Sequence, residues 1–165
     1  RPRLLLVPRH PQRFDEVAAL VERSGASLSR RSAWFDDQPG EVAQAADVWL
    51  GDTLREMPAY YAAARVALLG GSFEPLGGQN LIEAAACGCP VLMGPHTFNF
   101  ADAAQRSLAA GAAERVADID TGVLRAIALT ADEPLRARMA QAALAFSAAH
   151  RGAAQRMAAA VVATL

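Results

Sequence analysis

The sequence predicts an α/β fold of the Rossmann-like, doubly wound class: a parallel sheet of about six strands, helices on both faces, and further helices at the C-terminus. Short strands that are apolar along their whole length alternate with helical segments, a pattern typical of parallel sheets covered on both faces. The chain has 165 residues, of which 53% are apolar and 20% charged, so it has enough apolar side chains for a sizeable core. We therefore expect residues 1–165 to form one domain.

Strands and helices are predicted to alternate along the chain. Strands are predicted at residues 3–7, 27–32, 47–51, 66–70, 90–94 and 113–117. Helices are predicted at residues 10–25, 58–65, 80–87 and 99–111, with Gly25 and Gly111 as stop signals. From residue 121 onward the chain is predicted to be helical. One apolar stripe there comprises Leu135, Met139, Ala142 and Phe146, and after a break at Gly152 a second comprises Met157, Val161 and Leu165.

Composition excludes several classes of function. The net charge of −1 argues against broad nucleic-acid binding, so no nucleic acid is expected as a partner. The apolar runs are too short to span a bilayer, and no secretory signal is visible. Cys87 and Cys89 lack the nearby partners of a zinc site, so we expect two buried, reduced thiols in a cytosolic protein. Because the chain starts at Arg1 rather than Met, we expect it to be part of a longer protein.

A glycine-rich loop between a predicted strand and a predicted helix is the first candidate ligand site. Parallel sheets bind ligands at the carboxyl ends of their strands, and the loop from Gly70 to Asn80 lies at such an end. Its glycines form two pairs, Gly70 with Gly71 and Gly77 with Gly78, and Ser72 lies between the pairs. These glycines permit positive φ angles and a close approach of a ligand to the backbone. The spacing matches neither common phosphate-binding motif, and the alternative is a flexible turn.

The helix after this loop begins with Asn80-Leu81-Ile82-Glu83. Asparagine can cap a helix whose free N–H groups favour an anion, and a glutamate three residues later completes an arrangement like a capping box. The functional alternative is that Glu83 accepts hydrogen bonds from ribose hydroxyls. We expect Leu81 and Ile82 to face the core.

Pro8-Arg9-His10 follows the first strand, where the planar guanidinium of Arg9 suits a phosphate or carboxylate and His10 could donate to the same group. The alternative is a surface arginine beside a helix-capping histidine. After the third strand, Thr53 and Glu56 have the spacing of a capping box, but Pro58 favours a tight turn across residues 54–56 and a helix starting near it. Such a turn would leave backbone groups free to contact a base edge.

The loop from Gly94 to Phe100 follows the fifth strand and contains His96 and Asn99. No serine, cysteine or carboxylate is placed in the sequence to form a catalytic triad with His96. We therefore expect His96 and Asn99 to order the loop or to contact substrate. No cluster of carboxylates or histidines suits a metal, so no metal and no cofactor is expected.

Nearly the whole chain resembles one family. The run "GGSFEPLGGQNLIEAAACGCPVLMGPHTFNF", with "VPRHPQRF" before it and "GDTLREMPAYYAAARVALLGGS" between, is similar to the carboxyl-terminal half of bacterial 3-deoxy-D-manno-octulosonic acid (Kdo) transferases. These are GT-B type glycosyltransferases with two Rossmann-like domains. Some relatives carry a glutamate where this chain has Pro75, so no donor-site role is given to Glu74.

The resemblance implies an inverting transfer of Kdo from CMP-Kdo to the lipid A precursor in lipopolysaccharide biosynthesis, at the cytoplasmic face of the inner membrane. In the family this half binds the donor, and the matching positions here are Pro8, Arg9, Leu54, Arg55, Glu56, Asn80, Leu81, Ile82 and Glu83. The catalytic base and the membrane anchor lie in the N-terminal half, which also receives the acceptor. We therefore expect this chain to bind CMP-Kdo without turning it over.

Two other hypotheses stay open. The chain could belong to another nucleotide-sugar transferase or epimerase that uses UDP, which a competition of CMP against UMP would separate. It could also be a non-catalytic module that uses the same fold for protein contact, which predicts an exposed apolar patch and self-association independent of nucleotide. The sequence leaves open the number of Kdo units, the acceptor and the oligomeric state.

Overall fold

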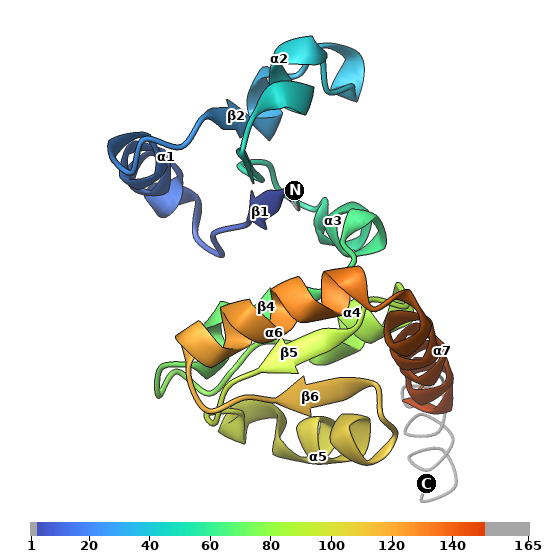
Figure 1. The fold of residues 1–165 in the computed structure, drawn as a ribbon. Helices are drawn as coiled ribbons and strands as arrows, with labels where there is room; N and C mark the ends of the chain where they lie inside the picture. The colour runs from blue at the N-terminus through green and yellow to red at the C-terminus, as the bar shows by residue number, and fades with distance from the viewer. Residues whose placement is uncertain (1–2, 151–165) are drawn as a thin grey trace, which may run out of the picture. The chain divides into compact units, whose positions relative to one another are not determined.

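The computed structural model describes residues 3–150 (Figure 1). The chain divides into two compact units, Arg1–Tyr60 and Tyr61–Leu165. Within residues 3–150 there are six strands, which form one three-stranded parallel sheet in each unit. The predicted α/β class is thus confirmed, with strand pairing within each unit instead of across one six-stranded sheet. That residues 1–165 act as a single domain stays a prediction.

The first unit has a sheet in the order β1-β3-β2. Its elements are β1 (Leu4–Leu6), α1 (Phe14–Arg23), β2 (Leu28–Arg30), α2 (Glu41–Ala45) and β3 (Val48–Leu50), followed by α3 (Met57–Ala63), which crosses the division between the units. Leu4 and Leu28 both pair with Val48, so the carboxyl ends of the three strands share one edge. Helix α1 packs on this sheet through buried Ala18 and Val21; it ends at Arg23, and the predicted stop signal Gly25 follows two residues later with a φ of +81°.

The second unit has a sheet in the order β4-β5-β6. Its elements are β4 (Ala67–Leu69), α4 (Leu81–Ala86), β5 (Val91–Met93), α5 (Ala101–Ala109), β6 (Ala113–Arg115), α6 (Ile119–Ala131) and α7 (Glu133–His150). Strand β6 is an edge strand, as predicted. Single-turn 3-10 helices occur at Pro11–Arg13, Arg31–Ala33, Phe35–Asp37, Gly70–Ser72 and Phe98–Phe100.

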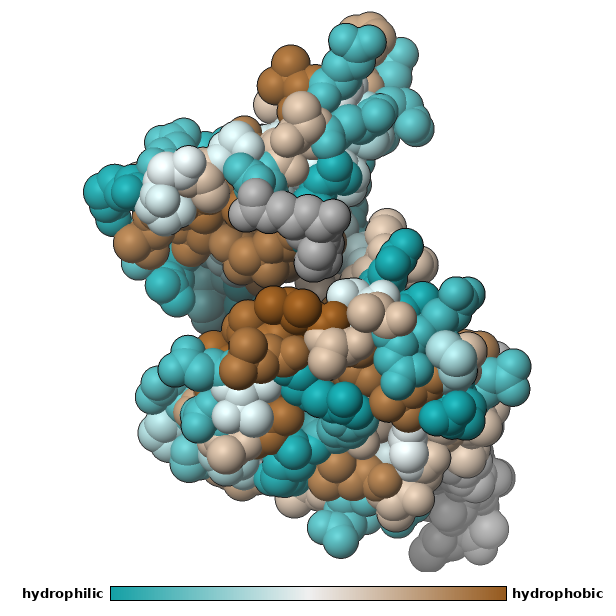
Figure 2. Space-filling view, viewed as in Figure 1, coloured by the Kyte–Doolittle hydropathy of each residue, from teal (hydrophilic) through white to brown (hydrophobic). Residues whose placement is uncertain are grey.

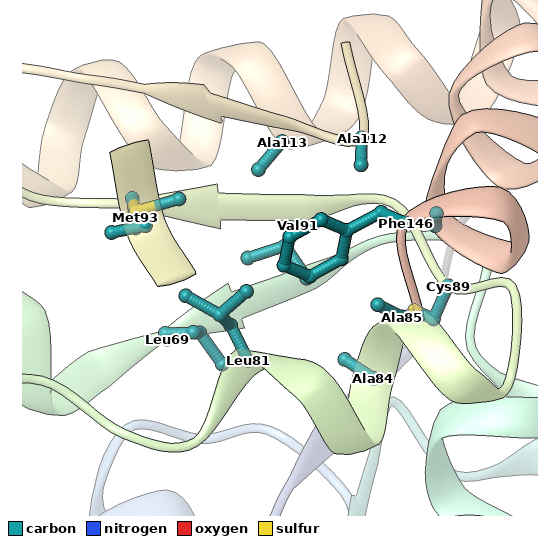
Figure 3. Close-up of a cluster of buried hydrophobic side chains, with 12 residues drawn as sticks. Leu69, Leu81, Ala84, Ala85, Cys89, Val91, Met93, Ala112, Ala113 and Phe146 are labelled. Atoms are coloured by element: carbon teal, nitrogen blue, oxygen red, sulfur yellow. The ribbon is translucent and has the colours of Figure 1, made fainter. Parts of the chain in front are cut away.

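The central strand β5 connects two hydrophobic cores, because side chains alternate across a strand. Val91 and Met93 point to one face, where they pack with residues of α4 and with Phe146 of α7 (Figure 3). Leu92 points to the other face and packs with Leu129 of α6 and Met139 of α7. Helices therefore cover both faces of this sheet, as the apolar pattern of the strand predicts.

The C-terminal helical region is divided at Asp132, between α6 and α7, a break that we did not predict although Pro134 in the first turn of α7 signals it. The Asp132 carboxylate accepts a hydrogen bond of 2.9 Å from the backbone N–H of Leu135, which caps the start of α7. The predicted stripe on α7 is confirmed, since Met139 and Phe146 are buried. The predicted break at Gly152 and the second stripe, Met157, Val161 and Leu165, lie outside the described residues.

The outer surface of α6 is apolar. Ile119, Val123, Leu124 and Ile127 are each at least 45% exposed, and a hydrophobic patch lies over this helix (Figure 2). Among residues 3–150, no helix is both long enough and apolar enough to cross a membrane. Neither Cys87 nor Cys89 is in a disulfide; Cys89 is buried as predicted and Cys87 is half-buried, and burial raises the pKa of the Cys89 thiol to about 12.

Candidate functional site

The candidate site of the second unit is built from two loops that leave neighbouring strands at the same edge. Residues 70–80 follow β4 and residues 94–99 follow β5, and the two strands are parallel and paired in register. The carboxyl edge of a parallel sheet is where ligands bind in folds of this class. The predicted site residues Ser72, Gly77, Gly78, Asn80, Glu83, His96 and Asn99 all lie in these loops or at the start of α4.

The second loop packs so closely against the first that glycine is needed at two positions of the first loop. Gly77 and Gly78 have φ angles of +88° and +83°, which residues with a side chain rarely adopt. A Cβ atom on Gly77 would lie 2.1 Å from the Asn99 side-chain nitrogen, and one on Gly78 would lie 3.2 Å from the His96 carbonyl oxygen. Protein atoms thus occupy the space that these glycines leave open, where we predicted an approaching ligand.

Ser72 connects the two strand ends and is fully buried. Its hydroxyl donates to the carbonyl oxygen of Leu69 at 2.5 Å and accepts from the Gly94 N–H at 2.7 Å. Its own carbonyl accepts from the His96 N–H at 2.9 Å. Ser72 therefore holds the two loops together, and its contact with a ligand stays a prediction.

His96 and Asn99 order the second loop. Asn99 is exposed, and it donates from its backbone to Gly77 at 3.1 Å and from its side chain to the Leu76 carbonyl at 3.2 Å. His96 is half-buried and is held through its backbone by Ser72. The loop-ordering alternative therefore describes the geometry of both residues, and contact with substrate stays a prediction.

Asn80 caps α4 as predicted. Its side-chain oxygen accepts from the Ile82 N–H at 3.0 Å, and its side-chain nitrogen donates to Glu83 Oε1 at 3.1 Å. One of the helix N–H groups that we expected to hold an anion is therefore already engaged. Leu81 is 1% exposed and Ile82 packs against the core, so their side chains face inward as expected.

The Glu83 carboxylate is the exposed acidic group of this segment. Asn80 orients it through Oε1, and no described residue donates to Oε2. An oriented carboxylate with an open oxygen suits a pair of hydroxyl donors. The charge of Glu83 also acts on Tyr61: burial, and secondarily this charge, raise the pKa of Tyr61 to about 12.

In the first unit, Pro8, Arg9 and His10 follow β1 as predicted. Arg9 and His10 are exposed, and no described residue forms an ion pair with Arg9. His10 precedes the 3-10 helix at Pro11–Arg13, but its side chain makes no capping hydrogen bond, so the capping alternative is wrong. The guanidinium of Arg9 is available to an anion.

The segment after β3 forms the predicted turn, and α3 begins at Met57. Arg55 has a φ of +67°, Leu54 is 65% exposed, and both belong to the turn. The Glu56 side chain, a predicted ligand contact, is instead engaged by protein groups. It accepts from Arg31 at 2.6 Å, from the Tyr60 hydroxyl at 2.8 Å and from Thr53.

A buried carboxylate that the sequence did not single out, Asp52, supports this turn. Its side chain is 1% exposed and accepts from Arg30 at 2.6 Å and from the backbone and hydroxyl of Ser32 at 2.9 and 2.6 Å. Burial raises the pKa of Asp52, but the hydrogen bonds from Ser32 and Arg30 outweigh burial and hold it below the usual value. Its only sequence signal is its place directly after a strand.

Within residues 3–150, no three histidine, cysteine or acidic side chains gather closely enough to hold a metal ion. The expectation that no metal or cofactor is needed stays a prediction. Within the first unit, the exposed guanidinium of Arg9 suits an anion; within the second unit, the exposed carboxylate of Glu83 suits hydroxyl donors.

Comparisons with known proteins identify the family. A family model described as "Glycosyl transferase-like" matches residues 29–161. The chain is 56% identical over 156 residues to a 3-deoxy-D-manno-octulosonic acid transferase of Bordetella pertussis, covering 94% of this chain and 36% of that protein. It is 36% identical over 155 residues to the Haemophilus influenzae transferase of that name, covering 93% and 35%. The chain thus spans about a third of the length of these relatives.

A solved structure agrees. The C-terminal CMP-Kdo binding domain of WaaA from Acinetobacter baumannii superimposes with a TM-score of 0.78 at 28% identity, covering 87% of this chain and 72% of that one. The Rossmann-like fold and the resemblance inferred from the sequence are thereby confirmed. The chain belongs to the glycosyl transferase-like family and is similar within it to the 3-deoxy-D-manno-octulosonic acid transferases.

Proposed function

We propose that this chain is the donor-binding part of an inverting glycosyltransferase that transfers Kdo from CMP-Kdo to the lipid A precursor. The observation that carries the proposal is the 56% identity over 94% of the chain to a Kdo transferase. Further support comes from the structural match to the C-terminal CMP-Kdo binding domain of WaaA from Acinetobacter baumannii. The loops at the carboxyl edge of the second unit are also ordered by their own hydrogen bonds, which reduces the entropy lost on binding.

Different predicted residues would bind different parts of the donor. Oε2 of Glu83 would accept from the ribose hydroxyls, and the Arg9 guanidinium would bind the phosphate. The exposed backbone at Leu54 and Arg55 would contact the base, since the Glu56 side chain is engaged by Arg31. As the bond to Kdo breaks, negative charge grows on the phosphate of CMP, and a preorganised cation lowers the free energy of that transition state.

The rest of the reaction belongs to the whole protein. The N-terminal half would supply the catalytic base, the lipid A precursor site and the contact with the cytoplasmic face of the inner membrane. The 165-residue chain would then bind CMP-Kdo and CMP without transferring sugar. The number of Kdo units added is a property of that whole enzyme.

Isothermal titration calorimetry of the chain with CMP and with CMP-Kdo tests the proposal. Binding of both ligands with one-to-one stoichiometry is expected, and absence of heat at millimolar concentration would refute it. Arg9→Ala and Glu83→Gln should each weaken CMP binding by about 1–3 kcal/mol, the range for a hydrogen bond that involves a charged group. Arg23→Ala and Glu133→Gln are matched controls, because these exposed residues lie on α1 and α7, outside the predicted site.

The competing hypotheses give different outcomes in the same titration. A UDP-dependent transferase or epimerase predicts that UMP displaces CMP. The apolar patch over α6 is the feature that a non-catalytic module would use (Figure 2). That alternative predicts self-association in sedimentation experiments and no response to any nucleotide.

A further inference from the structure

The proposed donor carries a carboxylate on its sugar as well as the phosphate, because Kdo is an octulosonic acid. A carboxylate is bound most strongly by a guanidinium, which can offer it two parallel N–H groups. The residues named so far bind the nucleotide, and none of them is a cation in the second unit. We therefore looked for an arginine at the carboxyl edge of the β4-β5-β6 sheet.

Most described arginines of this unit are committed elsewhere or lie at other places. Arg106 pairs with Asp102 at 3.0 Å, and Arg125 forms a two-point pair with Glu114 at 2.6 and 2.7 Å. Arg136 donates to the carbonyl groups at the end of α6. Arg65 precedes β4 at the amino edge of the sheet, and Arg138 lies on α7.

Arg115 is different: it is the last residue of β6, so it lies at the carboxyl edge, and it is exposed. Its Nη1 donates to the Pro95 carbonyl at 2.9 Å and its Nη2 donates to Thr97 Oγ1 at 3.1 Å. These two bonds fix the guanidinium against the second loop and leave its other N–H groups without a described acceptor. No described carboxylate forms an ion pair with it.

The guanidinium borders the glycine loop. Thr97, to which Arg115 donates, lies against Gly78: a Cβ on that glycine would be 3.3 Å from the Thr97 Cα. Gly78 is followed by Gln79 and then by Asn80, the residue that orients Glu83. The proposed ribose contact and this cation are therefore linked through Thr97 and the short chain segment from Gly78 to Asn80.

The neighbouring acidic groups leave the positive charge of Arg115 uncompensated. Glu114 is adjacent in sequence, but successive strand residues point to opposite faces, and Arg125 pairs with it. The Asp118 carboxylate accepts from the Thr121 N–H at 2.8 Å and caps α6. The guanidinium of Arg115 would therefore attract a ligand carboxylate, and the acidic groups adjacent to it in sequence already have protein partners.

We propose that Arg115 binds the carboxylate of the donor sugar and so distinguishes CMP-Kdo from CMP; this inference rests on the proposed function. The two protein hydrogen bonds of Arg115 orient the guanidinium before the ligand arrives. Binding of the nucleotide itself does not involve this residue. The result is a subsite for the acidic sugar at the end of β6, next to the subsite for the nucleotide.

Calorimetric titration of the 165-residue chain with CMP-Kdo and with CMP, in parallel, tests this subsite. Arg115→Gln keeps a side chain that can donate to Pro95 but removes the charge. It should weaken CMP-Kdo binding by about 10- to 100-fold, as for loss of a charged hydrogen-bond partner, and leave CMP binding unchanged. Arg65→Gln is the matched control, since this exposed arginine lies at the opposite edge of the sheet, and it should change neither affinity.

The outcomes separate the two proposals. If CMP binds the native chain and Arg115→Gln leaves the affinity for CMP-Kdo unchanged, the carboxylate subsite is refuted while the donor-binding function stands. Equal weakening of CMP and CMP-Kdo would also refute it, because Arg115 would then act only by holding the loop of residues 94–99. Failure of the native chain to bind either ligand would refute the donor-binding function.

Discussion

Removal of the Ser72 hydroxyl should destabilise the second unit more than any comparable change at a buried serine. In Ser72→Ala the Gly94 N–H loses its acceptor and the Leu69 carbonyl loses its donor, both in a buried setting. An unsatisfied buried group costs about 1–3 kcal/mol, so the two together should lower the free energy of unfolding by about 2–6 kcal/mol.

Urea denaturation followed by circular dichroism is the appropriate assay. Both tryptophans, Trp34 and Trp49, lie in the first unit, so fluorescence would report on that unit instead. With a urea slope of about 2 kcal/mol per molar, the midpoint of the transition that belongs to the second unit should fall by about 1–3 M.

Ser107→Ala is the control, because Ser107 is equally buried but its hydroxyl makes one described bond, 2.8 Å to the Ala104 carbonyl one turn earlier in α5. That substitution should cost about 1 kcal/mol or less. Equal midpoints for the Ser72 and Ser107 variants would refute the reasoning that Ser72 joins the two loops.

Three further predictions concern strain and ionisation. Arg55→Gly should stabilise the first unit by about 0.5–1 kcal/mol in urea denaturation followed by fluorescence, because Arg55 has a φ of +67°, whereas Arg23→Gly within α1 should destabilise it. Tyr60 and Tyr61 have pKa values raised to about 12, so tyrosinate absorbance should stay low until well above pH 10. The contribution of these two neutral phenols to the free energy of unfolding should be complete below about pH 10 and should be lost as the pH rises through 12. A large absorbance rise near pH 10 in the folded chain would contradict this burial. The pKa of Asp52 is lowered, so the contribution of its carboxylate to the free energy of unfolding is present above about pH 4 and is lost on acidification. Asp52→Asn should therefore be less stable than the native chain at neutral pH, and this difference in the free energy of unfolding should shrink below about pH 4.

The order of strands and helices could be predicted because it follows from local patterns. Val91, Leu92 and Met93 form a run that is apolar throughout, and such a run predicts a strand covered on both faces. Asn80 with Glu83 predicts a helix start, and the structure has the cap. The division of the C-terminal region at Asp132 was missed although Pro134 signals it, since proline is disfavoured inside a helix and tolerated in its first turn.

The roles of side chains were harder to predict because they depend on residues distant in sequence. Gly77 is required by Asn99, and Glu56 is engaged by Arg31, which lies 25 positions earlier. Arg115 was not singled out because a charged residue at the end of an edge strand has no distinctive local pattern. Its partners, the Pro95 carbonyl and the Thr97 hydroxyl, come within reach only because the sheet places the loop after β5 beside the end of β6.

Amide hydrogen exchange of the chain with and without CMP tests the central claim most directly. The account predicts that CMP slows exchange in three segments, residues 8–10, 54–56 and 77–83, and leaves the helices α6 and α7 unchanged. Protection confined to other segments, or no protection at a CMP concentration that saturates the calorimetric signal, would contradict it.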